Sequence, residues 1–197
     1  MAGSDIERRI VSILFCDLVG FTSLSERLDA EDVATLQEAY FSAVKDAVAR
    51  YGGQLEKFIG DAAVAIFGTP ASRDDDAERA VRCGFAIAGA LQQVCARLGL
   101  DEDALRVRVG VNTGEAIVHP SPAPGEPIVT GDAVNTAARL QSTAPPGAVL
   151  VGPTTALAVA DAIELADAQV LELKGKAHPV RASLAVSTRP ERSRDHA

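Results

Sequence analysis

The sequence lacks the features that mark several classes of protein. Its three cysteines, Cys16, Cys83 and Cys95, are widely spaced and odd in number, which supports neither a disulfide framework nor a CxxC zinc site. Charged residues interrupt the apolar stretches well before the ~18 residues that a membrane span needs, and the N-terminus lacks the pattern of a signal peptide. We therefore expect no membrane segment in this chain and a soluble, cytoplasmic protein.

Positive charge is also scarce. The chain has 19 Lys and Arg against 27 Asp and Glu, a formal net charge of −8. A nucleic-acid-binding face needs a basic patch, so no nucleic-acid partner is expected, although a phosphate site can still occupy a local part of an acidic protein. The sequence GxxxxGK[ST] is absent as well, which excludes a Walker-type phosphate loop.

What is present fits a single domain. A length of 197 residues with 47% apolar content is enough for one substantial core and too short for two. Residues 1–8 are polar and predict a flexible N-terminus, and residues 187–197 carry almost no apolar side chains, as in a disordered tail or the start of a linker. The folded domain is expected over residues 9–186.

Strands and helices are predicted from the spacing of apolar residues. A nearly unbroken apolar run over 10–16 indicates a buried strand, and helical spacing predicts long helices over 29–51 and 74–98. Two hairpins are expected, one with its turn at Gly60-Asp61 and one with its turn at Asn112-Thr113-Gly114. The resulting order β-α-β-β-α-β is the signature of an α+β, ferredoxin-like sheet with helices packed on one side.

Additional strands and helices are expected after this core. They are a stiff, proline-rich arm over 119–127, a helix over 132–144, a short helix over 154–159, and strands over 148–151, 163–173 and 180–186.

Two carboxylates are expected to converge at one edge of the sheet. Asp17 ends the first strand and Asp61 lies at the tip of a hairpin whose second strand should neighbour the first. Convergent carboxylates suit a hard divalent cation that completes its shell with substrate phosphates. Taken singly, Asp17 is better explained as a cap of the following turn and Asp61 as a turn residue; taken together, they favour a metal site.

Three further sets of residues suit a phosphorylated ligand. Gly20-Phe21-Thr22-Ser23 follows Asp17 directly and can turn backbone N–H groups toward an anion, or it is an ordinary strand-to-helix turn. Asn135 and Arg139 lie four apart on one helix face, where they can orient a ribose and stabilise phosphoryl charge, or form a solvated polar face. Lys174 can reach a polyphosphate, or is simply surface charge.

Together these residues resemble the class III nucleotidyl cyclase catalytic domain of the bacterial adenylate cyclase type. The resemblance is carried, in the family's order, by the stretches Phe15-Cys16-Asp17-Leu18-Val19-Gly20-Phe21-Thr22, Lys57-Phe58-Ile59-Gly60-Asp61, Arg108-Val109-Gly110-Val111-Asn112-Thr113-Gly114, Gly131-Asp132-Ala133-Val134-Asn135-Thr136-Ala137-Ala138-Arg139-Leu140 and Leu173-Lys174-Gly175-Lys176. It implies conversion of ATP to 3′,5′-cyclic AMP and pyrophosphate.

The resemblance also implies roles for individual residues. Asp17 and Asp61 would hold two Mg²⁺ or Mn²⁺ ions per active site. The other implied roles are phosphate binding by the backbone at Gly20, Phe21 and Thr22, ribose orientation by Asn135, transition-state stabilisation by Arg139 and triphosphate binding by Lys174. The family works as a head-to-tail pair, so a homodimer is expected in which the metal ligands of one protomer face Lys57, Asn135, Arg139 and Lys174 of the other.

Base recognition is where this sequence departs from the family. A lysine at position 57 is typical of adenylate cyclases and favours ATP. The partner position, seven residues before Asn135, is usually Asp or Thr but is Ile128 here, and Thr130 is the nearest residue that can substitute. Ile128 also motivates an alternative function, a catalytically weak or inactive nucleotide-binding dimerisation module. A diguanylate cyclase shares the topology, but its Gly-Gly-acid-Glu-Phe loop is absent.

Overall fold

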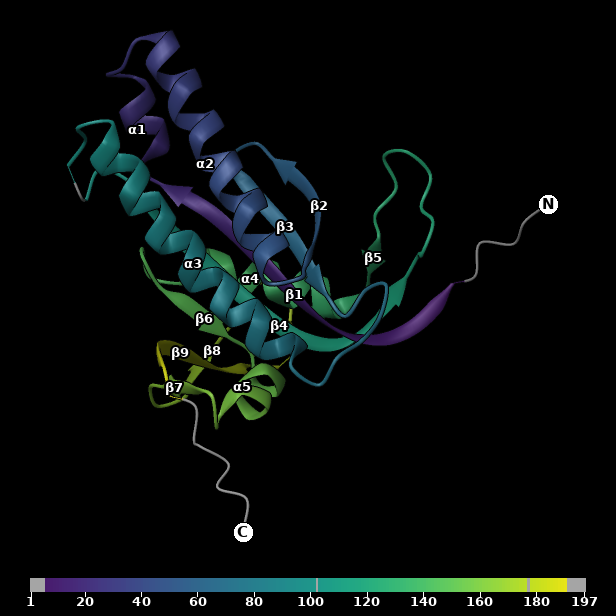
Figure 1. Ribbon diagram of the computed structural model, residues 1–197. Coiled ribbons are helices and arrows are strands. Elements are labelled where there is room, and N and C mark those ends of the chain that lie inside the picture. The colour runs from purple at the N-terminus through teal and green to yellow at the C-terminus, as the bar shows by residue number, and fades with distance from the viewer. Residues whose placement is uncertain (1–5, 102, 177, 191–197) are drawn as a thin grey trace.

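A computed structural model describes residues 6–101, 103–176 and 178–190 of the chain (Figure 1). Strand β1 (Glu7–Val19) begins the fold and strand β9 (Val180–Thr188) ends it. Both strands therefore extend two residues beyond the predicted domain limits of 9 and 186. Most of the predicted tail, residues 191–197, and residues 1–5 of the predicted flexible N-terminus lie outside the described residues.

The ferredoxin-like core is confirmed. In chain order it consists of β1, α2 (Ala30–Arg50), β2 (Gln54–Ile59), β3 (Ala62–Phe67), α3 (Asp76–Arg97) and β4 (Arg106–Val118). The four strands lie in the order β2-β3-β1-β4, and every neighbouring pair is antiparallel. The first strand thus neighbours the third, as the metal-site prediction requires.

Further elements extend this core. They are α1 (Phe21–Ser25), β5 (Val129–Thr130), α4 (Asp132–Thr143), β6 (Val149–Val151), α5 (Pro153–Val159), β7 (Ile163–Leu165) and β8 (Gln169–Leu171). The sheet continues past β4 through β6, β9 and β7. The single strand predicted over 163–173 is two short strands, β7 and β8, which both pair with β9. The proline-rich arm forms the connection between β4 and β5, without helix or strand over 119–127.

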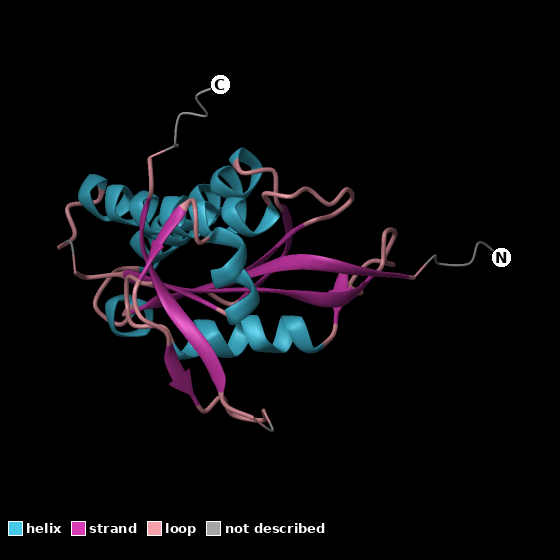
Figure 2. Ribbon diagram, turned by 90° about the horizontal axis from the view of Figure 1, so that it is seen from below, coloured by secondary structure: helices cyan, strands magenta, loops and turns pink. Residues whose placement is uncertain are grey.

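The sheet is covered on both faces (Figure 2). Leu14 and Cys16 of β1 face the core beneath α2 and α3, whereas Val11 and Ile13 face α4 on the other side. This alternation explains why the apolar run over 10–16 is nearly unbroken, since both faces of the strand are buried. We call the second side of the sheet the α4 face.

The second predicted hairpin is wrong. Residues 106–118 form one continuous strand, β4, which pairs with the whole of β1 from Glu7 opposite Val118 to Val19 opposite Arg106. Asn112 does not turn the chain; its side-chain amide is buried and donates a hydrogen bond to the backbone oxygen of Ala133 in α4 at 3.1 Å. The Asn-Thr-Gly signal reflects contact with a helix instead of a change of chain direction.

Helix α4 lies directly on β4 at Gly110. A β-carbon at this position would be 2.2 Å from the backbone nitrogen of Gln141 and 2.5 Å from the backbone oxygen of Ala137. These atoms belong to the helix backbone and cannot rotate aside. Any side chain larger than hydrogen at residue 110 must push α4 off the sheet.

We predict that Gly110→Ala destabilises the domain by about 3 kcal/mol, near the upper end for an overpacked core. Gly89→Ala in α3 is the matched control, because a β-carbon there meets no atom within 4 Å and should stabilise the helix by about 0.5–1 kcal/mol. Chemical denaturation of both variants measures the difference. Equal unfolding midpoints for the two variants would contradict the close contact.

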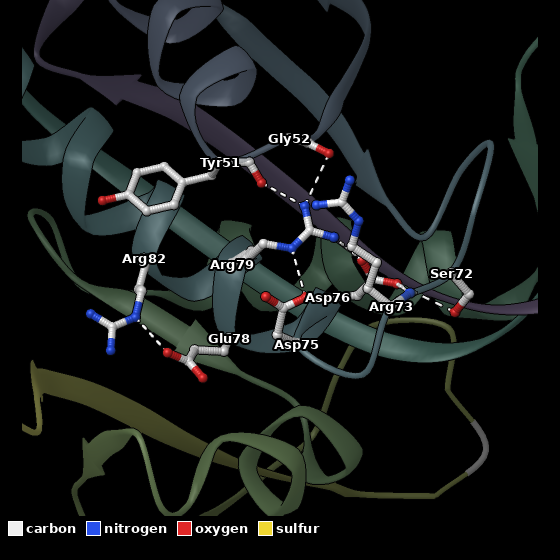
Figure 3. A network of polar contacts seen from close by, with 9 residues as sticks. All are labelled: Tyr51, Gly52, Ser72, Arg73, Asp75, Asp76, Glu78, Arg79 and Arg82. Carbon is white, nitrogen blue, oxygen red and sulfur yellow. Dashed lines mark hydrogen bonds and ion pairs between the residues drawn. The ribbon is translucent and has the colours of Figure 1, made fainter. Parts of the chain in front are cut away.

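Arg79 joins the other two long helices (Figure 3). Its guanidinium donates to the backbone oxygens of Tyr51 at 2.6 Å and Gly52 at 3.1 Å, just after the end of α2. The same group pairs with Asp75 at 2.9 Å and with Asp76, at the start of α3. The side chains of Arg79 and Asp76 are only 12% and 9% exposed, so this contact holds the end of α2 against the start of α3 in a largely dry environment.

We predict that Arg79→Met destabilises the domain by about 3 kcal/mol, because it leaves the Asp76 carboxylate buried without its cationic partner. Arg82→Met is the control. Arg82 pairs with Glu78 at 2.7 Å in a more exposed position, and its loss should change stability by less than about 1 kcal/mol. The free energy of unfolding of both variants, from denaturant titration, tests the contrast; similar losses would argue against the central role of Arg79.

Candidate active site

The two aspartates lie at the same end of the sheet. β1 and β3 pair up to Cys16 opposite Ala63, so Asp17 directly follows this pairing and Asp61 directly precedes β3 in the β2–β3 turn. The pKa of Asp17 is raised, first by burial and then by the charge of Asp61. Mutual repulsion of this kind arises when two carboxylates are close together, and a divalent cation between them would relieve it.

Two further side chains reach Asp17, and both escaped the sequence-based analysis. Arg108 lies opposite Asp17 across the β1–β4 ladder and its Nη2 is 3.7 Å from Asp17 Oδ2. Gln141 of α4 donates to the same oxygen through Nε2 at 3.5 Å. Apolar periodicity does not reveal the strand register that sets Arg108 opposite Asp17. The one sequence signal was a pair of arginines, Arg106 and Arg108, that alternate with valines at the start of this strand.

Arg108 has unused hydrogen-bonding capacity. One of its terminal nitrogens donates to the backbone oxygen of Ser142 at 3.4 Å. Its Nε is buried and has no hydrogen-bond partner among the described residues. The positive charge of Arg108 offsets part of the rise in the Asp17 pKa that burial and Asp61 cause. A guanidinium beside a carboxylate pair is suited to hold an anion that approaches the same carboxylates.

In the turn that follows β1, the backbone at Gly20 packs closely against the backbone at Ala104. Gly20 has φ = 92°, and a β-carbon there would lie 2.7 Å from the backbone oxygen of Ala104. The backbone N–H of Leu24 bonds back to the Gly20 oxygen at 3.0 Å and starts α1. The first N–H groups of a helix, here those of Phe21 and Thr22, have no acceptor within it. They follow Asp17 by four and five residues in the chain.

Three of the predicted nucleotide-binding residues share one cavity. Lys57 of β2, Thr130 of β5 and Asn135 of α4 line a hollow of about 360 Å³ on the α4 face, together with Phe15 and Ile59. Neither Asp17 nor Asp61 lines it. Ile128 is absent from its walls as well and lines a neighbouring cavity with Arg9 and Pro70. The structure therefore brings Thr130, and not Ile128, into one cavity with Lys57.

Arg139 and Lys174 form a second, adjoining group. Arg139 Nη2 is 3.5 Å from the position of a β-carbon on Gly175, so its guanidinium lies against the turn that carries Lys174. Lys176 of this turn pairs with Asp132 at the start of α4, at 2.5 Å. This ion pair ties the turn to the helix that carries Asn135 and Arg139. Lys174 itself is exposed and free to reach outward.

Two of the solved structures that resemble this chain are nucleotidyl cyclases at above 30% identity. The adenylyl cyclase CyaB from P. aeruginosa is 32% identical, with a TM-score of 0.85 over 94% of this chain and 97% of that chain. The guanylyl cyclase Cya2 is 33% identical, with a TM-score of 0.84 over 93% of this chain and 94% of that chain. The nucleotidyl cyclase fold expected from the sequence is thereby confirmed.

Sequence comparison agrees. An uncharacterized protein of Rhizobium meliloti is 39% identical over 176 residues, which cover 88% of this chain but only 17% of that protein. The chain likewise spans about a fifth of other curated relatives. Within the described ranges, no helix is long and apolar enough to cross a membrane. The model of the adenylate and guanylate cyclase catalytic domain matches residues 6–185, and this chain belongs to that family.

Proposed function

We propose that this domain converts ATP to 3′,5′-cyclic AMP and pyrophosphate. The observation that carries the proposal is the cavity lined by Lys57, Thr130 and Asn135 in a chain of this family. A lysine ammonium only donates hydrogen bonds, whereas a threonine hydroxyl also accepts them. This pair matches adenine, whose N1 accepts and whose amino group donates. Guanine would present its N1–H donor to the ammonium, so the cavity favours ATP.

Asp17 and Asp61 are the residues that would hold two Mg²⁺ or Mn²⁺ ions. Carboxylate oxygens are the ligands that these hard cations prefer. No cluster of three or more His, Cys, Asp or Glu side chains suited to a metal occurs in the described parts of the chain, so substrate phosphates would complete the coordination. When bound, the ions neutralise the triphosphate and assist loss of the proton from the ribose 3′-hydroxyl.

The remaining residues bind and orient the substrate. The backbone N–H groups at Gly20, Phe21 and Thr22 hold phosphate oxygens, and Lys174 binds the triphosphate. Asn135 orients the ribose so that its 3′-oxygen faces the α-phosphorus in line with the departing group. A bond forms between these two atoms as the bond to the β-phosphate oxygen breaks and pyrophosphate leaves. Arg139 stabilises the charge that develops during this exchange.

The site is assembled from two protomers in a head-to-tail homodimer. In one chain the aspartates lie outside the cavity that holds Lys57 and Asn135, so neither set of residues makes a complete site by itself. Ile59 lines the same cavity and is 53% exposed, which offers an apolar contact to a partner. A twofold axis would place the aspartates of each protomer opposite the cavity of the other and create two equivalent sites.

Turnover by the purified domain tests the proposal directly. With ATP and Mn²⁺ we expect cyclic AMP, formed faster than cyclic GMP from GTP, and Asp61→Asn should reduce the rate at least ~100-fold. Asp46→Asn, at an exposed acid on α2, is the matched control and should leave the rate unchanged. Nucleotide binding by a confirmed dimer without any turnover would instead support the alternative, a catalytically inactive nucleotide-binding module.

Mixing two inactive variants tests the shared site. Asp17→Ala and Arg139→Ala break opposite halves, so a heterodimer retains one intact site and an equimolar mixture should recover about a quarter of wild-type activity. A mixture of Asp17→Ala and Asp61→Ala is the control. Both changes fall in the same half, and no recovery is expected. Absence of recovery in the first mixture, with heterodimers demonstrated by mass, would refute a site shared between protomers.

A further inference from the structure

Strand β2 contains an extra residue at Glu56. Its ladder with β3 pairs Leu55 with Ala65 and Lys57 with Val64, which leaves Glu56 as a β-bulge. A bulge reverses the side-chain alternation that follows it. Leu55 therefore faces the core beneath α2 and α3, and Lys57 lines the cavity on the opposite face. Without the extra residue, Lys57 would share the face of Leu55 and point away from the cavity.

The bulged residue also reaches across to the segment that precedes β5. Glu56 Oε1 accepts a hydrogen bond from the backbone N–H of Ile128 at 3.0 Å. The backbone oxygen of Ile128 in turn accepts from the N–H of His119 at 2.8 Å. Both backbone polar groups of Ile128 are thus engaged. Its position, two residues before Thr130, is set by Glu56 on one side and by the proline-rich arm on the other.

We propose that Glu56 is a positioning residue for base recognition, an inference that rests on the proposed cyclase function. Lys57 and Thr130 belong to segments that are far apart in the chain, and the Glu56 carboxylate joins those two segments at the cavity that Glu56 lines together with both residues. The bulge directs Lys57 into the cavity, and the hydrogen bond fixes the distance at which the Thr130 hydroxyl stands from it. Glu56 itself touches no reacting atom.

We expect a substitution at Glu56 to change recognition of the base and to leave the chemical step unaffected. Loss of the Glu56–Ile128 hydrogen bond frees the segment before β5 and loosens the pairing of donor and acceptor that favours adenine. The aspartates at the other end of the site do not line the cavity, and Asn135, which does, is held by α4 and not by the segment that Glu56 contacts, so we expect the chemical step to be spared. We expect a higher KM for ATP and about a tenfold lower ratio of kcat/KM for ATP over GTP, the effect of one hydrogen bond, with kcat within about twofold of wild type.

Three substitutions separate the hydrogen bond from charge and bulk. Glu56→Gln keeps an acceptor oxygen at the same reach and should behave as wild type. Glu56→Asp keeps the charge but is one methylene shorter, and Glu56→Ala removes the acceptor. Both should lower the ratio of kcat/KM for ATP to that for GTP (the ATP:GTP ratio). Glu38→Ala, at an exposed acid on α2, is the matched control and should change nothing. Hydrogen exchange at the Ile128 amide should accelerate in the Asp and Ala variants and stay slow in Gln.

Each outcome decides the inference. Faster exchange at Ile128 with an unchanged ATP:GTP ratio would overturn it, because the segment would then be free without consequence for the base. An equal loss in the Gln and Ala variants would overturn it as well. If the wild-type dimer cyclises neither nucleotide, the cyclase proposal fails. The role of Glu56 is then tested by calorimetric Kd values for ATP and GTP, whose ratio should shift about tenfold in Glu56→Ala relative to wild type.

Discussion

The contact between α4 and β4 is the constraint on which the candidate site depends. Gly110 lets the helix backbone touch the strand, and Asn112, on the same face, bonds to the helix at Ala133. Helix α4 carries Asn135 and Arg139, so any lift of the helix would move both. Since Arg108 projects from this strand toward Asp17, a single strand supports the helix and also contacts the carboxylate.

The two faces of the sheet differ in what lies on them: a large apolar core on one and a cavity lined in part by polar side chains on the other. Beneath α2 and α3 the side chains are apolar and buried, and polar contacts such as those of Arg79 close the helix ends. On the α4 face, the cavity with Lys57 opens beside α4, where residues of β2, β3 and β1 line it. The larger core cluster thus lies on one face, whereas the cavity proposed to bind nucleotide opens on the other, which also holds a smaller core against α4.

Within the α4 face, the residues proposed to contact the base lie apart from those proposed to contact the phosphates. Lys57 and Thr130 share a cavity whose walls include neither aspartate. The aspartates, Arg108 and the turn at Gly20 gather instead at the end of β1. If these assignments hold, a change in base preference need not disturb the residues assigned to the phosphates. This separation is consistent with a family that contains both an adenylyl and a guanylyl cyclase of comparable similarity to this chain.

The sequence by itself determined the element order, the ferredoxin-like topology and the family, because apolar periodicity and short motifs are local properties of the chain. Only the tertiary structure decided how distant segments meet. It made 106–118 one strand, since an Asn-Thr-Gly signal serves a turn and a helix contact equally well. It set Arg108 opposite Asp17 and Glu56 beneath Ile128, because strand register and bulges depend on partners that lie far away in the sequence.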